Sequence, residues 1–283
     1  MAEIKYTERP VLPERPADGH KGTFGTALLL CGSYGMCGAE ILAAKAALRC
    51  GVGLVRAVVC AENYAPFLTA VPAAVTLPVR TDADGAPLVT AEQLETAFSR
   101  ADAVLIGCGL GRSSAAARLV KSALAYSTVP TVLDADGINA VCDDIHLIRK
   151  TKSSVIVTPH SGEMARLIGS TAEQVERDRT GIALRFAREN GCITVLKGHR
   201  TVIAFPDGQY KINATGCSGM ATGGSGDVLA GMLVSLLAQG MEPEAATEAA
   251  VWLHGKAGEL AAERLGERFM LPDDLTEELK NLL

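Results

Sequence analysis

The sequence lacks several features that define common protein classes. Its eight cysteines form no CxxC pair and no Cys/His cluster with zinc spacing. No apolar run reaches the length of a transmembrane helix, and residues 1–20 are polar and proline-rich, without the apolar core of a signal peptide. We therefore expect free, mostly buried thiols in a reducing compartment, no membrane association and a cytoplasmic location.

An excess of positive charge is also missing. The chain of 283 residues has a formal net charge of −5, so a basic groove for nucleic acid is not expected. Hydrophobic residues make up 48% and charged residues 21%, which favours a sizeable core over global disorder. No Ser/Gly linker, repeat or low-complexity tract divides the chain, and we expect one domain over residues 1–283.

Apolar strand-like runs alternate with helical patterns along most of the chain. This alternation predicts an α/β fold with a mostly parallel central sheet and helices on both faces. Residues 201–212 form a hairpin-like segment around a Pro-Asp-Gly turn. The expected strands are 26–31, 54–60, 104–106, 131–133, 155–157 and 193–196, and the expected helices are 37–50, 113–125, 162–168, 179–189, 226–238 and 244–264.

The sequence TGGSGDVLAG over residues 222–231 carries the clearest chemical signal. Glycines let a backbone approach a ligand closely, and the free amides of a helix start favour an anion. Asp227 falls in the first helical turn, where its carboxylate could accept a proton from an attacking hydroxyl. An Asp here could also merely cap its helix. The run of small residues before Asp227, in a glycine-rich stretch starting at Thr215, favours the catalytic interpretation.

Two familiar phosphate motifs are incomplete. No Gly-Lys-Ser/Thr follows the glycines of residues 222–226, so this is not a Walker A loop. Residues 107–111 read G-x-G-x-G, short of the dinucleotide fingerprint, and a tight strand-to-helix turn explains them equally well.

With these motifs the chain resembles a known family, the NAD(P)H-hydrate dehydratases of the ribokinase-like superfamily. The resemblance covers about residues 20–265 and is specific through the order of its motifs rather than through any one of them. The chain departs from the usual family pattern at Cys108, where Pro is common, and at Cys217 and Ser218, where Asn-Pro is common. The matching segments are 25–30, 38–39, 106–111, 133–139, 158–163, 196–203 and 223–233.

The resemblance implies a role for each candidate residue. Asp227 would be the catalytic carboxylate, and Glu163 would serve a magnesium and phosphate network. The anion hole would consist of Gly223, Gly224, Ser225 and Gly226. The AMP part of the nucleotide would contact Lys197, Gly198, His199, Arg200, Thr201 and Gly226, and the hydrated nicotinamide nucleotide would contact Ala39, Gly109, His160 and Asp227.

Structural explanations compete with several of these roles. His160 follows Thr-Pro and could cap the next helix, and Lys197 could be an ordinary surface charge. His254 fits a packed helix residue better than a catalyst. Asp134 and Asp136 could be turn or N-cap residues at a strand end. We favour function for His160 and Lys197 and leave the other three residues unassigned.

The implied activity is the dehydration of (S)-NADHX and (S)-NADPHX to NADH and NADPH. A hydroxyl on the reduced nicotinamide ring would be phosphorylated by ADP or ATP with Mg²⁺, and phosphate would then be eliminated. ADP is the expected donor because the chain resembles stand-alone members. The resemblance further implies a homotetramer and a separate NAD(P)H-hydrate epimerase as functional partner.

Two other functions remain open from the sequence. A ribokinase-like kinase for a vitamin or sugar would share the fold, the anion hole and Asp227, and His160 in place of the kinases' usual Asn separates the two patterns. A catalytically silent nucleotide-binding module would also share the fold, although the retained Asp227 and glycine cluster argue against it.

Overall fold

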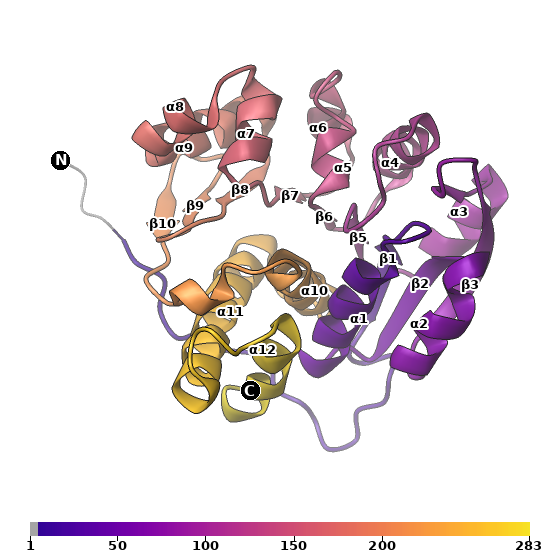
Figure 1. Ribbon diagram of the computed structural model, residues 1–283, viewed down its shortest axis with the longest axis horizontal. Helices are drawn as coiled ribbons and strands as arrows, with labels where there is room; N and C mark the ends of the chain where they lie inside the picture. Colours follow the sequence, from indigo (N-terminus) through magenta and orange to yellow (C-terminus); the bar gives the residue numbers. More distant parts are fainter. Residues whose placement is uncertain (1–4) are drawn as a thin grey trace.

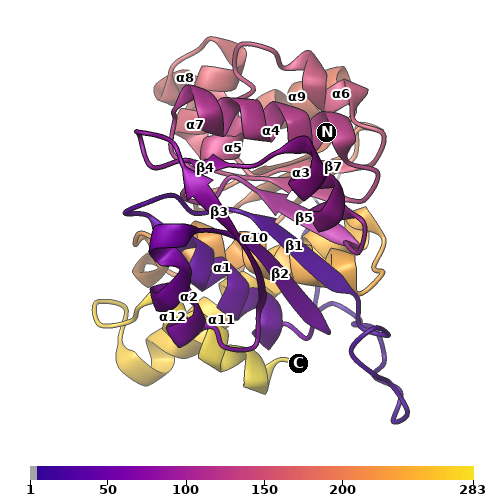
Figure 2. The same cartoon turned by 90° about the vertical axis from the view of Figure 1, so that its right-hand side faces the viewer.

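A computed structural model of the chain describes residues 5–283. The first four residues of the expected 1–283 domain and of the polar segment 1–20 lie outside it. One twisted sheet runs through the molecule with helices on both faces (Figures 1 and 2). In spatial order its strands are β10 (Tyr210–Ile212), β9 (Val202–Ala204), β8 (Ile193–Leu196), β7 (Val155–Val157), β6 (Thr131–Leu133), β5 (Ala103–Ile106), β1 (Thr26–Leu30), β2 (Leu54–Cys60), β3 (Val75–Thr81) and β4 (Pro87–Leu88).

The seven neighbouring strands β8, β7, β6, β5, β1, β2 and β3 pair in parallel. Strand β4 adds an antiparallel edge beside β3, and β9 and β10 add an antiparallel edge beside β8. The mostly parallel α/β sheet predicted from the alternation is therefore confirmed. Each expected strand and helix is present, with ends shifted by at most one residue.

The two sheet faces carry separate cores. Because side chains alternate along a strand, Ala27 and Leu29 of β1 pack on one face and Leu28 and Leu30 on the other. The first face is covered by α1 (Cys37–Arg49), α2 (Tyr64–Ala70), α10 (Ser225–Ala238), α11 (Pro243–Leu265) and α12 (Pro272–Glu278). The second face is covered by α3 (Ala91–Phe98), α4 (Ser114–Tyr126), α5 (Asp136–Asn139), α6 (His146–Lys150), α7 (Ser161–Ile168), α8 (Ala172–Arg177) and α9 (Arg179–Asn190).

Several elements were not expected from the sequence. Strand β3 has a Pro in its interior and is only partly buried, so it lacks the apolar run that marked the other strands. Helix α3 carries a capping box between Thr90 and Gln93, a signal that could have revealed it. The segment after residue 265, with α12, was also unassigned, and it packs against α11 and α1.

The strand order reverses between β1 and β5. The chain leaves β1 toward β2 on one side and leaves β5 toward β6 on the other. In open parallel sheets a crevice opens at the carboxyl ends of the strands at such a switch point, and ligands bind there. The loops at residues 31–36 and 107–111 flank this point, joined by the hydrogen bond from the Gly32 amide to the Cys108 carbonyl.

Candidate functional site

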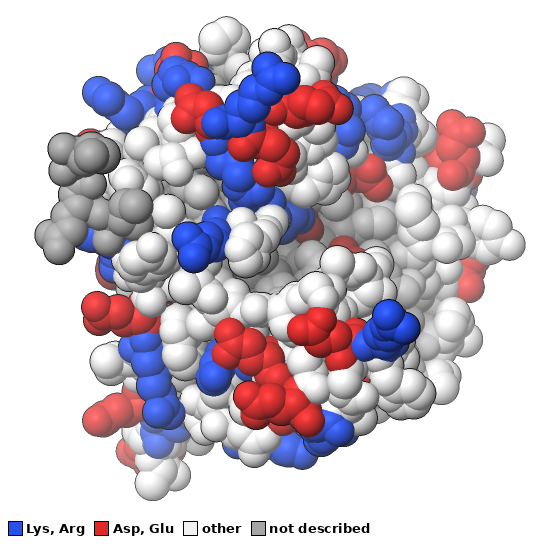
Figure 3. Space-filling view, turned by 60° about the vertical axis from the view of Figure 1, so that its left-hand side comes forward, with Lys and Arg blue, Asp and Glu red and all other residues white. Residues whose placement is uncertain are grey.

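The candidate site lies at the carboxyl edge of the sheet, between the ends of β5 to β8 and the start of α10. Figure 3 shows a hollow in the molecular face, with Lys and Arg along part of its rim and acidic groups nearby. The motifs at residues 107–111, 133–139, 158–163 and 196–201 each follow a strand that ends at this edge. Sheet topology thus gathers segments that are far apart in the sequence.

Helix α10 begins at Ser225, one residue earlier than predicted. Its N-cap is Gly224, which has a φ of 99°, and no side chain caps the helix. A residue with a Cβ would be strained at that φ, and the added carbon would also lie 2.5 Å from Leu42. Because no side chain occupies the helix start, its first amides remain available for an anion.

Asp227 lies in the first turn of α10 but is not its cap. The capping explanation for this residue is therefore wrong. Burial raises the pKa of Asp227 to about 6, with a further increase from Asp134 and opposing effects from Cys108 and Lys197. A carboxylate with this pKa is largely ionised at neutral pH and is well matched to accept a proton there.

Lys197 and Asp134 form the central ion pair of the site. The Lys197 Nζ lies 2.7 Å from Asp134 Oδ1, which also accepts the Thr158 hydroxyl at 2.7 Å. The side chains are 20% and 2% exposed, so the surface-charge explanation for Lys197 is wrong. Burial alone would lower the pKa of Lys197, but Asp134 and Glu163 outweigh it and the pKa is raised. The ammonium is thus firmly positive.

This ammonium also links the ion pair to the glycine turn. A Cβ placed on Gly226 would lie 3.3 Å from the Lys197 Nζ. Lys197 therefore brings a positive charge to the start of α10, where a phosphoryl group would meet both the amides and the ammonium.

His160 and Glu163 form a reciprocal cap at the start of α7. His160 Nδ1 accepts the amides of Gly162 and Glu163, and Glu163 accepts the His160 amide at 2.8 Å. The capping interpretation of His160 is therefore confirmed. Its Nε2 lies 3.4 Å from Glu163 Oε1, and its side chain is 55% exposed, so the ring can still contact a ligand.

The four residues after Lys197 form a turn between β8 and β9. His199 and Arg200 are exposed, Arg200 has a φ of 57°, and Thr201 donates its hydroxyl to the Gly198 carbonyl. Sequence reasoning missed Arg179, whose guanidinium donates to the Leu196 carbonyl at 2.8 Å and lies against Gly198. Nothing in the local sequence marks Arg179, because it reaches the turn from α9.

Ala39 and Gly109 meet across the switch point. A Cβ on Gly109 would lie 2.9 Å from the Ala39 Cβ and 2.8 Å from the Met36 carbonyl, and Gly109 has a φ of 64°. Its carbonyl accepts the Ser33 hydroxyl at 2.9 Å. This places two of the four predicted substrate contacts side by side.

Cys108 was noted only as a departure from the family pattern, but it lies among the charged groups. Its thiol is 3.6 Å from Asp134 Oδ2, and ligand atoms of Cys108, Asp134 and Asp227 all lie within 4.8 Å of one another. The contact with Cys31 and burial raise the pKa of Cys108 well above its usual value, so the group is a neutral thiol.

These three groups do not suit a magnesium ion held by protein alone. Mg²⁺ prefers six oxygen ligands in near-octahedral geometry and usually binds through substrate phosphates and water. Here one group is a thiol, and the Lys197 ammonium already neutralises Asp134. A magnesium ion at these groups would need further oxygen ligands, such as water or the phosphates of a bound nucleotide.

Asp136, left unassigned in the sequence analysis, has a structural role, and its neighbour Ala135 has an unusual backbone conformation. Asp136 accepts the Gly111 amide at 2.8 Å and the Asn139 side chain at 3.2 Å, as a turn residue does. Ala135, between the two aspartates, has a φ of 49° and a ψ of −116°. Such a backbone costs about 1–3 kcal/mol, and strain of this kind is typical of functional sites.

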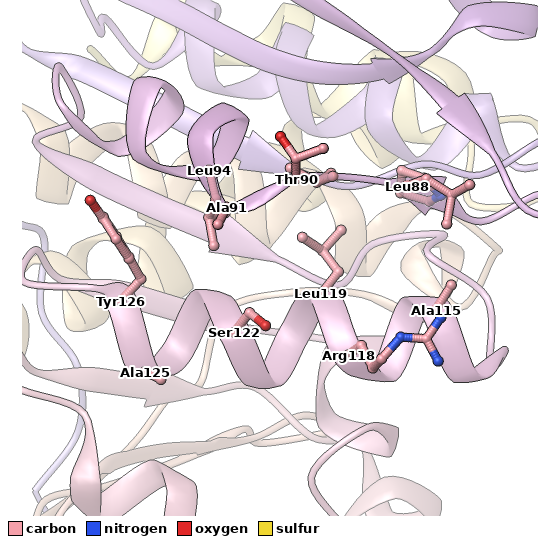
Figure 4. Close-up of a pocket in the computed structure, with 12 residues that line it drawn as sticks. Leu88, Thr90, Ala91, Leu94, Ala115, Arg118, Leu119, Ser122, Ala125 and Tyr126 are labelled. Atoms are coloured by element: carbon pink, nitrogen blue, oxygen red, sulfur yellow. The ribbon is translucent and has the colours of Figure 1, made fainter.

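A groove outside the candidate site lies on the other side of the sheet, against α3 and α4. A cavity of about 490 Å³ lies between the β4–α3 segment and α4, where Leu88, Leu94, Leu119 and Tyr126 line it (Figure 4). None of the candidate site residues lines it. The site is identified by its chemistry and by the sheet topology rather than by cavity size.

A mostly parallel sheet with a topological switch point, an uncapped glycine-rich helix start and a first-turn aspartate are typical of ribokinase-like α/β enzymes, and solved structures confirm this fold. The family model for NAD(P)H-hydrate dehydratase matches residues 27–281. This chain belongs to that family.

Individual relatives agree. An ADP-dependent (S)-NAD(P)H-hydrate dehydratase of Neisseria meningitidis is 40% identical over 90% of this chain and 83% of its own length. A bifunctional NAD(P)H-hydrate repair enzyme of Moorella thermoacetica is 43% identical over 97% of this chain, which spans 52% of that protein. The ADP/ATP-dependent NAD(P)H-hydrate dehydratase of Bacillus subtilis, co-crystallised with ATP/Mg²⁺, is 30% identical, with a TM-score of 0.84 over 100% of this chain and 98% of that one.

Proposed function

We propose that this chain dehydrates (S)-NADHX and (S)-NADPHX to NADH and NADPH, with a nucleoside diphosphate or triphosphate as co-substrate. The observation that carries the proposal is Asp227, a buried first-turn carboxylate with a pKa of about 6 at an uncapped helix start. The family match and the named relatives supply the substrate class.

In the proposed reaction Asp227 takes the proton from the hydroxyl of the hydrated ring as its oxygen attacks the terminal phosphoryl group. The amides of Gly223, Gly224, Ser225 and Gly226 and the Lys197 ammonium stabilise the charge that develops on the phosphoryl oxygens. A magnesium ion bound with the nucleotide would neutralise further phosphate charge. The nucleotide leaves as AMP from ADP or as ADP from ATP. The lone pair of the ring nitrogen then expels phosphate, and loss of a proton from the neighbouring ring carbon restores the ring double bond, so phosphorylation converts hydroxide into a good leaving group.

The nucleotide is proposed to lie between the 197–201 turn and the start of α10. Lys197 lies between the two, and the exposed residues Gly198, His199 and Arg200 with the half-buried Thr201 present a partly basic rim for the AMP part. We favour ADP as donor because the Neisseria relative is ADP-dependent, although the Bacillus relative is named ADP/ATP-dependent.

The hydrated nicotinamide nucleotide is proposed to contact Ala39 and Gly109 at the switch point and His160 across the crevice. Glu163, assigned to the magnesium and phosphate network, would act mainly by orienting its two neighbours. It caps His160 and lies 4.0 Å from the Lys197 Nζ.

A kinase whose phosphorylated product persists is the alternative that shares this geometry. The exposed imidazole of His160 favours the dehydratase, because it offers a ring contact at the substrate side of the crevice. The arrangement of Asp227 and Lys197 favours either enzyme over a silent nucleotide-binding module.

A spectrophotometric assay tests the proposal directly. Hydrated NADH is incubated with Mg²⁺ and either ADP or ATP, and the absorbance of the dihydronicotinamide ring is followed. We expect the absorbance to return together with stoichiometric phosphate release. Accumulation of a stable phosphorylated compound would instead indicate a kinase, and nucleotide binding without turnover would indicate a silent module.

The wider context is also proposed. We expect a homotetramer acting in the cytoplasm with an NAD(P)H-hydrate epimerase. Relatives with about twice the length of this chain are named bifunctional, so the second activity can be fused as well as separate. Among the described residues, none of the helices has the length and apolarity needed to cross a bilayer.

A further inference from the structure

A buried histidine on α11 contacts the first peptide of α10. The Nε2 of His254 lies 2.9 Å from the Ser225 carbonyl oxygen and 3.3 Å from the Ser225 hydroxyl. A carbonyl oxygen only accepts, so Nε2 must carry the proton and donate it. The proposed reaction makes no use of this side chain.

The donor is fixed over the physiological pH range. Burial lowers the pKa of His254 to about 4, and the bond to Ser225 opposes this effect only in part. The ring is therefore neutral near pH 7 and has one N–H, which is committed to Ser225. A group in this state cannot shuttle protons, but it can hold a backbone in place.

The contact acts on the anion hole through a single peptide plane. The Ser225 carbonyl and the Gly226 N–H belong to the same planar trans peptide and point in opposite directions. Whatever holds the carbonyl therefore sets the direction of the N–H. A hydrogen bond to the carbonyl also polarises the peptide and strengthens its N–H as a donor.

The Gly226 peptide needs this restraint because glycine itself does little to fix its backbone. It has no side chain to limit its backbone, and its Cα lies beside the Lys197 ammonium. The peptide lies in the first turn of α10, where the fewest helical bonds restrain the backbone, and a tilt there would misalign its amide with the phosphoryl group. Oxyanion-type stabilisation depends on donors that are aligned before charge develops.

The same helix also holds the segment that leads into the glycine turn. Thr215 donates to the Trp252 carbonyl at 3.1 Å, and the Gly216 amide donates to Glu259 at 2.9 Å. A Cβ on Gly255 would lie 2.7 Å from the Thr215 backbone, so the approach is close. Helix α11 thus contacts both the start of α10 and the segment that leads into the glycine turn.

We propose that His254 is a positioning residue that aims the Gly226 amide at the transferring phosphoryl group, with α11 as the fixed support. This inference rests on the proposed function for its kinetic consequence but not for its binding consequence.

The test compares two substitutions at one position. His254→Leu keeps an apolar side chain of similar bulk and removes the donor, while His254→Gln places an amide N–H near the former Nε2. Because loss of one such donor typically costs about 10²- to 10³-fold in kcat and a misaligned donor costs less, we expect His254→Leu to lower kcat by about 10- to 100-fold. The KM for hydrated NADH should stay within about twofold, and His254→Gln should recover most of kcat.

Thr247→Val is the matched control. The Thr247 hydroxyl is buried on the same helix and donates to the Pro243 carbonyl at 2.7 Å, so its bond stays within α11. This variant should lose stability and keep kcat. If His254→Leu keeps kcat within twofold of the wild type, or His254→Gln is no better than His254→Leu, the proposal is overturned.

Calorimetric titration with MgATP separates this proposal from the proposed function. We expect the affinity to fall by about 2- to 10-fold in His254→Leu, the effect of one weakened hydrogen bond, and to return in His254→Gln. This result would support the positioning role even if wild-type protein left hydrated NADH unchanged. Should His254→Leu fail to fold, His254→Asn serves instead, because its shorter amide stops before the Nε2 position. Unchanged affinity and kcat in that variant would overturn the proposal.

Discussion

Two carboxyl groups, Asp134 and Glu40, are buried near the same edge of the sheet, and they differ in their surroundings. Asp134 is 2% exposed and is bonded by Lys197 and Thr158, with the Cys108 thiol beside it. Glu40, in the first turn of α1, is fully buried, and within residues 5–283 neither of its oxygens has a hydrogen-bond partner.

The difference shows where the fold can hold charge. The strand ends from β5 to β8 supply an ammonium, a hydroxyl and a thiol around Asp134, and a buried charge persists only with such partners. Under the loop that follows β1, Glu40 packs so closely against Gly32 that a Cβ there would lie 2.5 Å from Glu40 Oε2, and burial raises the pKa of Glu40 well above its usual value. The charged region is the one to which we assign chemistry, and Glu40 is a neutral acid in the core.

The largest expected effect is the loss of activity when the Asp227 carboxylate is replaced. Asp227→Asn keeps the size of the side chain but removes the proton acceptor, so kcat should fall by about 10²- to 10⁴-fold. Steady-state assay with hydrated NADH measures this loss. Unfolding free energy should change by only about 1 kcal/mol, and nucleotide should bind as well or better because a negative charge is lost near the phosphates. Near-normal turnover would mean that another group is the base, with Asp136 the next candidate.

Removing the Lys197 ammonium should destabilise the fold around Asp134. Lys197→Met leaves Asp134 buried without its cation, and we expect unfolding free energy to fall by about 3 kcal/mol. Chemical denaturation measures the change. Adding Asp134→Asn to this variant should restore part of the loss, because the unpaired charge is then gone.

The matched control for this loss is Lys121→Met. Lys121 pairs with Asp143, whose side chain is 73% exposed, and such a pair contributes about 1 kcal/mol or less. Equal losses in Lys197→Met and Lys121→Met would contradict the special role of the Asp134 pair.

Replacing Glu40 should raise the unfolding free energy, whereas replacing Lys197 should lower it. Glu40→Met replaces an unpartnered acid by an apolar side chain of similar length, so unfolding free energy at pH 8 should rise by about 1–3 kcal/mol. The pH dependence follows from the raised pKa. The contribution of Glu40 to stability is fully present below about pH 4.5, where both states hold the proton, and is lost as pH rises through the folded-state pKa.

Denaturation between pH 4.5 and 8 measures this dependence. Wild-type protein should lose stability across the range relative to Glu40→Gln, which cannot ionise. Parallel curves for the two proteins would show that Glu40 finds a partner in solution.

The smallest expected effect is a shift in the pKa of the Asp227 carboxylate. Activity should fall below about pH 6 as Asp227 takes up a proton, and the Cys108 thiol holds that pKa down. In Cys108→Ala the fall in kcat/KM should therefore begin at higher pH, while Cys108→Ser, which keeps a donor, should resemble the wild type. Identical pH profiles in all three proteins would show that the thiol does not contact Asp227 in the working enzyme.

Much of the fold followed from local pattern. The apolar runs at β1, β2 and β5 to β8 and the glycine-rich start of α10 are strong signals, because burial on both faces demands continuous apolar strands. Strands β3 and β4 escaped prediction because β4 is a short edge strand and β3, beside it, is only partly buried and contains a Pro. Among the candidate site residues, Asp227, Lys197 and His160 stood out through their motifs, whereas Arg179 and Cys108 did not.

The sequence by itself determined the α/β class, the order of the elements and the residue types available for phosphoryl chemistry. Only the tertiary structure decided which of these residues act on one another. Asp134 and Lys197 are 63 positions apart, and Ser225 and His254 are 29 apart, yet each pair forms a hydrogen bond. The physical reason is that parallel strands bring their carboxyl ends to one edge and adjacent helices bring their faces together. Whether a buried carboxyl group such as Asp134 or Glu40 finds a partner depends on these long-range neighbours and not on local sequence.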